Sequence, residues 1–122
     1  MNGRVGEINV ICTDLERSLT FYHDVLGFEV TGEEGIAVHL RCGDQPFLLL
    51  PVAREPLPPT PYCSRPAYSF DFMVDRIDEA VAHLHAHSVA FESEWTPGDS
   101  HVFVRDPDGL VIEVIEVSPS RA

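Results

Sequence analysis

Three histidines occupy alternate positions in one segment of the chain, His83, His85 and His87, and imidazole is a common metal ligand. The apolar residues around them recur at helical spacing, and alternate positions on a helix project about 200° apart. The three imidazoles therefore cannot converge on one ion. We predict that they lie on a solvated face of a helix.

The cysteines are the other residues whose type alone suggests a metal site or a covalent link. They share no short spacing (Cys12, Cys42 and Cys63). This pattern offers neither a CxxC metal site nor a complete set of disulfides. We expect reduced thiols with a structural role.

Acidic residues dominate the charge of the chain: 20 Asp and Glu against 8 Lys and Arg give a formal net charge of -12. This charge repels phosphate backbones and anionic lipids, so we expect neither nucleic acid nor membrane as a partner. The same field concentrates metal ions and amine-bearing ligands. The apolar stretches fall far short of the roughly 18 residues of a membrane span, and no leader opens the chain, so we expect a cytoplasmic protein.

One pattern occurs twice along the chain, at residues 7–15 and again at 69–77: an alternating strand, an acidic cap and the start of a helix. Three strand-like runs follow each helix. They are 28–31, 36–41 and 47–51 in the first half and 90–95, 102–105 and 110–117 in the second. Each half is therefore predicted to be a βαβββ module.

Acidic or hydroxyl residues are expected to cap both helices. Thr13 or Asp14 is the predicted cap of a first helix that ends near Asp24, and Asp75 that of a second helix that ends near His87. Such helices cover only one face of a sheet, so the other face is free to curl around a ligand.

A proline-rich segment separates the modules, since residues 53–66 hold five of the ten prolines. Proline fixes φ and lacks an N–H, which favours a stiff, extended connector. We predict one α+β domain over residues 1–122, built from module one (4–52), the connector (53–66) and module two (67–118).

Two stretches of the chain resemble the signature segments of the vicinal oxygen chelate superfamily: INVICTDLERSLTFYHDVLGFEV and HVFVRDPDGLVIEV. This superfamily includes glyoxalase I, extradiol dioxygenases, fosfomycin-resistance transferases and bleomycin-resistance proteins, and the chain is most similar in style to the small bleomycin-resistance-like members. The resemblance spans nearly the whole chain. It implies paired βαβββ modules that form an open, cup-shaped barrel, and a homodimer. The fold hosts enzymes and binding proteins alike, so function must be argued from the site.

Where superfamily members use a metal, the resemblance places ligands on the first and last strand of each module. In this chain those positions fall on Glu7, Ser69, Glu113 and Leu49, the last subject to a slip of one residue. A transition metal generally requires three protein ligands, commonly including imidazole or thiolate. We therefore expect no cofactor. The alternative is a divalent metal held by Glu7 and Glu113 with His39 or His101.

Alternation along the strands extends the expected site, because side chains two residues apart share a face. The predicted ligand-binding set is Glu7, Asn9, His39, Ser69, Asp71, His101, Phe103 and Glu113. Two carboxylates about 5 Å apart repel by roughly 3 kcal/mol at an effective dielectric near 20, so a cup of this composition requires compensation. The alternatives are an internal arginine (Arg41 or Arg105), a proton shared between acids, a metal completed by a histidine, or a cationic ligand.

The leading prediction is a binding protein that sequesters a cationic or aromatic, antibiotic-like natural product and confers resistance without an essential metal. Aromatic side chains expected near the cavity or its rim support it: Phe47, Tyr62, Tyr68, Trp95 and Phe103. The alternative is a glyoxalase- or dioxygenase-like enzyme, with a metal or a general-base Glu; its candidate catalytic residues are Glu7, Glu113 and His101. The identity of the ligand stays open, as does whether one chain or two build each cup.

Overall fold

A computed structural model describes residues 1–117 of the protein. The chain divides into two compact units between Pro56 and Leu57, inside the predicted connector. Each unit is described by itself below. The last residue of predicted module two, Ser118, lies outside the described residues.

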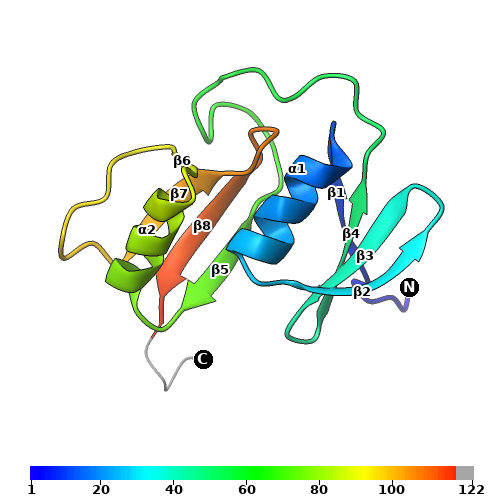
Figure 1. Ribbon diagram of the computed structural model, residues 1–122, viewed down its shortest axis with the longest axis horizontal. Coiled ribbons are helices and arrows are strands. Elements are labelled where there is room, and N and C mark those ends of the chain that lie inside the picture. The colour runs from blue at the N-terminus through cyan, green and yellow to red at the C-terminus, as the bar shows by residue number, and fades with distance from the viewer. Residues whose placement is uncertain (118–122) are drawn as a thin grey trace. The chain divides into compact units, whose positions relative to one another are not determined.

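Each unit contains one helical segment and one mixed four-stranded sheet (Figure 1). Unit 1 comprises β1 (Ile8–Ile11), α1 (Leu15–Leu19), the π-helical turn η1 (Thr20–Val25), β2 (Glu29–Glu34), β3 (Ala37–Cys42) and β4 (Gln45–Leu50). Unit 2 comprises β5 (Phe70–Val74), α2 (Ile77–Ala86), β6 (Ala90–Phe91), β7 (His101–Arg105) and β8 (Val111–Glu116). The sheet orders are β1-β4-β3-β2 and β5-β8-β7-β6, and in each sheet the first strand runs parallel to the last. Two units with this element order confirm the predicted pair of βαβββ modules.

The first helix begins as predicted and ends differently. Asp14 is its N-cap, and the Asp14 carboxylate accepts a hydrogen bond of 2.9 Å from the backbone N–H of Arg17. Beyond Leu19 the helix widens into η1, which a sequence pattern alone does not reveal. The wider turn buries Phe21, Tyr22 and Val25 together.

The predicted cap of the second helix is wrong. Arg76, not Asp75, is the N-cap of α2, and its side chain makes no capping hydrogen bond. A carboxylate from a distant strand takes this role, because the Glu116 Oε1 atom accepts a hydrogen bond of 3.1 Å from the N–H of Ile77. The N-terminus of α2 is thus joined to β8 through Glu116, while Asp78 in its first turn accepts a bond of 2.9 Å from the N–H of Glu79.

Each sheet buries the face that its own helical segment covers. In unit 1 the buried side chains include Val10, Cys12, Phe21, Tyr22, Val25, Phe28, Val38, Leu40, Phe47 and Leu49. In unit 2 they include Ile77, Val81, Leu84, Val102, Val104, Ile112 and Val114. Phe47 was expected near a ligand cavity, but it packs in this core with its ring 4.9 Å from that of Phe28. The other face of each sheet, which we call the open face, carries Asn9, His39, Asp71 and Glu113 together with apolar side chains such as Leu48 and Met73.

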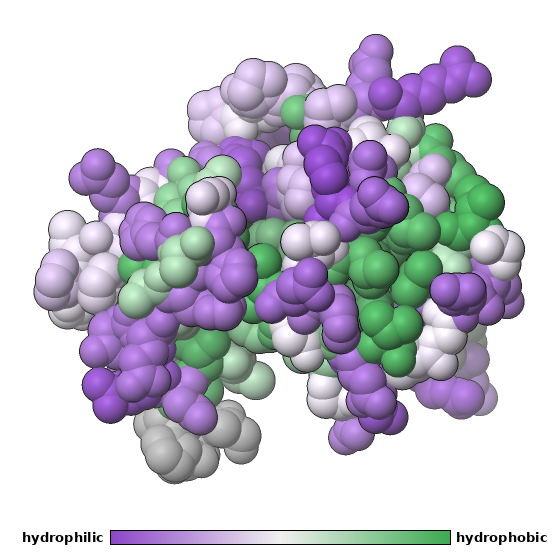
Figure 2. Space-filling model, viewed as in Figure 1, coloured by the Kyte–Doolittle hydropathy of each residue, from purple (hydrophilic) through white to green (hydrophobic). Residues whose placement is uncertain are grey.

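The helix histidines lie as predicted, exposed to solvent on α2. Hydrophilic side chains gather over this helix (Figure 2). The rings of His83 and His87 lie 4.6 Å apart, and that of His85 stacks on Phe91 at 4.3 Å. No helix within residues 1–117 is long and apolar enough to cross a membrane.

The predicted strand over residues 90–95 is shorter in the structure, because β6 ends at Phe91. Trp95 lies in the loop that follows, where its indole N–H donates a hydrogen bond of 3.0 Å to the backbone oxygen of Asp99. Trp95 therefore stabilises this loop and is not part of the sheet.

The hydrogen bond between Glu116 and Ile77 yields a stability prediction. We expect Glu116→Ala to lower the free energy of unfolding by about 1 kcal/mol, because it removes the acceptor for a helix-terminal N–H. Glu116→Gln keeps an accepting oxygen and is expected to lose about half as much or less. Urea unfolding of both variants measures the difference, and equal losses would show that the hydrogen bond contributes nothing.

Candidate functional site

The open face of unit 2 brings three predicted site residues into one row across adjacent strands. Asp71 of β5 is in register with Glu113 of β8, and Glu113 is in register with Phe103 of β7. The next row along the same face holds His101, whose ring meets that of Phe103 edge to face at 5.6 Å. A carboxyl pair therefore lies beside an aromatic ring and an imidazole.

Glu113 is the residue in this row with a displaced pKa. Its side chain is half-buried, and burial is the largest cause that raises its pKa above the ordinary value. The hydrogen bond and the negative charge of Asp71 raise the pKa further, and the charge of His101 opposes them. Glu113 is therefore held toward its protonated form, which can share its proton with Asp71 through that hydrogen bond.

Arg105 lies on the same face, but it neutralises a different acid. Its guanidinium donates a hydrogen bond of 2.6 Å to Glu92, and further bonds to the backbone oxygens of Gly109 (2.8 Å) and Thr60 (2.9 Å). Glu92 also accepts a bond of 2.9 Å from the N–H of Tyr62, and this bond, with Arg105, keeps the pKa of Glu92 below its ordinary value. Arg105 thus fixes the proline-rich arm to the sheet and does not neutralise the Asp71–Glu113 pair.

The proline-rich arm adds aromatic surface to this face. The Tyr62 ring lies 5.0 Å from that of Phe103, and the Tyr62 hydroxyl is 2.8 Å from the hydroxyl of Ser69. Ser69, expected on the first strand of the module, lies just before β5 and is exposed.

The open face of unit 1 holds a different cluster. His39 and Asn9 both flank Leu48 in the register of the sheet. One ring nitrogen of His39 lies 2.6 Å from Glu7, and the other lies 3.7 Å from Glu34. An imidazole therefore lies between two carboxylates and is hydrogen-bonded to Glu7, while Arg41 pairs with the exposed Glu29 at 2.6 Å.

The sheet register corrects one of the sequence assignments. Leu48 pairs with Asn9 in unit 1 as Glu113 pairs with Asp71 in unit 2, so Leu48 is the counterpart of Glu113. Leu49 is fully buried on the helix-covered face. Neither leucine offers a donor atom, so this position cannot supply a metal ligand whichever leucine occupies it.

The donor set does not fit the metal ion that the resemblance implies. One of the four positions is an alkyl side chain, and the hydroxyl of another, Ser69, is paired with Tyr62. His39 could complete a set, but both of its ring nitrogens face carboxylates. Across residues 1–117, no three His, Cys, Asp or Glu side chains are grouped as metal ligands. The residues at these positions therefore do not form a transition-metal site.

Two acids of these faces, Glu34 and Glu92, were missed from the sequence. Glu34 contacts His39 because a bulge between Val30 and Gly32 changes the register of β2 against β3, and no motif marks such a bulge. Glu92 was expected on a strand, and its pairing with Arg105 was not foreseen. A single cup that combines Glu7 with Asp71 and Glu113 stays a prediction.

The raised pKa of Glu113 predicts how stability depends on pH. The folded state favours the protonated form, so the contribution of Glu113 is fully present below about pH 4.3, the pKa of an unperturbed Glu, and is lost as the pH rises through the raised value. We therefore expect Glu113→Gln to gain stability over the unmodified chain as the pH rises from about 4 to about 8. Urea midpoints across this range test it, with the exposed Glu94→Gln as the matched charge control. A difference that does not change with pH would contradict the shared proton.

Comparisons with known proteins agree with this architecture. The glyoxalase/bleomycin resistance protein/dioxygenase superfamily matches residues 4–114. The uncharacterized protein YaeR of Escherichia coli (strain K12) is 33% identical over 126 residues, which cover 93% of this chain and 95% of that protein. The structure of lactoylglutathione lyase from Agrobacterium tumefaciens is 26% identical, with a TM-score of 0.67 and 94% of each chain covered. A glyoxalase/dioxygenase from Nostoc punctiforme, 22% identical, has the same fold with a TM-score of 0.76 over 94% of this chain and 91% of that one. The chain belongs to the glyoxalase/bleomycin resistance protein/dioxygenase superfamily.

Proposed function

We propose that the protein binds a small organic cation with an aromatic part on the open face of unit 2, without an essential metal. The observation that carries this proposal is the carboxyl pair, Asp71 and Glu113, whose second negative charge is suppressed by burial and by mutual repulsion. An amine placed between the two carboxylates restores that charge, because an opposite charge favours ionisation. The electrostatic contribution to binding such a ligand is largest where no cationic side chain of the protein already pairs with the carboxylates.

The neighbouring rings suit the rest of such a ligand. Phe103 is in register with Glu113, and Tyr62 lies against Phe103. An aromatic ligand can stack on these rings, and a cation near a ring face gains about 0.5–2 kcal/mol. The site therefore joins one charge-selective end to one flat, apolar end.

The biological role that we propose is sequestration of an antibiotic-like natural product, and hence resistance. The superfamily includes resistance proteins by its description, and its members bind small molecules and commonly form dimers. We propose a homodimer whose open faces line acidic cups, with Glu7, Asn9 and His39 contributing from unit 1. This arrangement follows from the resemblance and from the polar composition of both open faces.

A ligand panel tests the proposal. We expect a cationic aromatic compound, but not its neutral analogue, to raise the melting temperature, since ligand at 100 times its Kd adds about 2.7 kcal/mol to the free energy of unfolding.

The affinity for this cation is expected to rise with pH through the raised pKa of Glu113, because the bound state is the deprotonated one. Glu113→Gln is expected to weaken binding at least about tenfold, and Glu94→Gln to leave it unchanged. Equal affinities in both variants would refute the role of the carboxyl pair.

A second candidate function is supported by the same raised pKa. A carboxylate whose pKa lies above its ordinary value is suited to act as a general base near neutral pH, and Glu113 could remove a proton next to a carbonyl group. The 26% identity to lactoylglutathione lyase favours such chemistry. The acidic surroundings oppose it, because they repel an anionic thiol tripeptide.

Turnover separates the two functions. The enzyme candidate predicts conversion of dicarbonyl or catechol substrates that is lost in Glu113→Gln and retained in Glu94→Gln. The binding proposal predicts ligand affinity with no turnover of either substrate class. Metal analysis of protein purified without chelator accompanies the assay, since stoichiometric metal together with turnover would overturn the metal-free account.

A further inference from the structure

A pocket of about 120 Å³ lies within unit 2, between the proline-rich arm and the turn before β8. Its walls are mainly apolar and aromatic, and include Leu57, Pro61, Tyr62, Tyr68 and Val111. The carboxyl pair of the function proposed above does not line this volume, although Tyr62 borders both sites.

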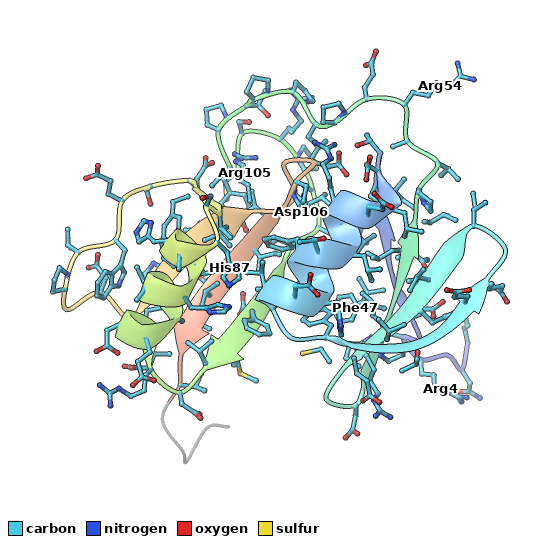
Figure 3. All side chains as sticks on the ribbon, viewed as in Figure 1. Arg4, Phe47, Arg54, His87, Arg105 and Asp106 are labelled. Atoms are coloured by element: carbon cyan, nitrogen blue, oxygen red, sulfur yellow. The ribbon has the colours of Figure 1, made fainter. Side chains whose placement is uncertain are left out.

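Several tethers hold the arm against the sheet and so define the pocket. The N–H of Leu57 donates a hydrogen bond of 2.9 Å to the backbone oxygen of Asp108. Gly109 has a φ of +92°, and a Cβ there would lie 3.4 Å from the Cβ of Leu57. Together with the bond from Arg105 to Thr60, these contacts fix both ends of one wall. The labelled Arg105 side chain can be followed beside the arm (Figure 3).

The charge of the pocket is opposite to that of the chain. Although the chain holds 20 acidic residues, none of the described residues that line the pocket is acidic. The charged lining residues are Arg65 and Arg105. Arg105 is committed to Glu92 and to two backbone oxygens, so its charge is already balanced. Arg65 is exposed and has no ion-pair partner within residues 1–117, which leaves one uncommitted guanidinium at this pocket.

The volume limits what the pocket can hold. A dry, enclosed cavity of about 150 Å³ in another protein binds benzene, so about 120 Å³ is of the order of one small ring; the pocket here is open to solvent, since Leu57 and Tyr68 at its rim are exposed. Tyrosine and proline walls favour a flat apolar group over a polar one. A guanidinium favours a carboxylate, which it can bind through two parallel hydrogen bonds.

We propose that this pocket binds a small aromatic carboxylate, with the ring between the arm and Val111 and the carboxylate on Arg65. The inference goes beyond the function proposed above, and it concerns a ligand of the opposite charge. It also does not require that function to be correct, since Glu113 is not among the residues that build the pocket.

Titration of the ¹⁵N-labelled full chain with benzoate tests this inference. We expect saturable amide shifts confined to residues 57–68 and 105–111, and no such saturation with benzylamine, the cation of matched size. Arg65→Gln is expected to weaken benzoate binding about three- to fivefold, the upper part of what an exposed ion pair contributes. Arg54→Gln removes the same charge from an arginine that extends away from the fold, and is expected to change nothing (Figure 3).

A third variant tests the cavity itself. Ala67 is exposed and lines the pocket, so Ala67→Trp is expected to fill it and abolish benzoate binding while the urea midpoint stays unchanged. Glu113→Gln is expected to retain benzoate binding even where it loses the cationic ligand, so the two proposals fail separately. The inference is overturned if benzylamine binds as well as benzoate, if Arg65→Gln matches Arg54→Gln, or if benzoate shifts do not saturate.

Discussion

The proposed site depends on two carboxyl groups in register on neighbouring parallel strands, Asp71 and Glu113. Burial and mutual repulsion disfavour ionisation of both, and the arginine on the same face is engaged elsewhere. The pair therefore accepts either a shared proton or an external cation. This competition is the physical basis of the proposed binding function and equally of the general-base alternative.

The architecture explains why such a pair is tolerated. Each helical segment covers one face of its sheet, and most of the apolar core lies on that side. The open faces contribute little to the core, so they can carry acids at modest cost in stability. The acids of the open face of unit 1 have a partner within the chain, because His39 lies between Glu7 and Glu34. The two repeats thus share a backbone plan but differ in the electrostatic state of their open faces.

Much of the fold was predictable from local pattern. The repeated strand–cap–helix segments predict both modules, and alternation correctly places Glu113 and Phe103 on one face. Features that depend on contacts between distant residues were not predictable. Glu116, and not Asp75, accepts the hydrogen bond from the N–H of Ile77 at the start of α2. The strand register makes Leu48, and not Leu49, the counterpart of Glu113.

The candidate site was predictable in its composition more than in its pairings. Strand alternation predicts which acids and histidines lie on the open faces. It does not predict whether an arginine, a histidine or a shared proton lies next to each acid, because that depends on side-chain geometry. The ion pair of Arg105 with Glu92 is an example of a contact that the pattern does not predict. Glu92 follows directly after β6, and no periodicity predicts that this strand has only two residues. The pocket beneath the arm depends on the same bonds, so the proline-rich composition alone could indicate only a stiff connector.

The most direct test is a ¹³C NMR titration of the Glu113 side-chain carboxyl, with and without a bound organic cation. The account predicts a midpoint above that of an ordinary glutamate in the free protein, which moves down when the cation is added. A free-protein midpoint at or below the ordinary value, unaffected by the cation, would contradict it.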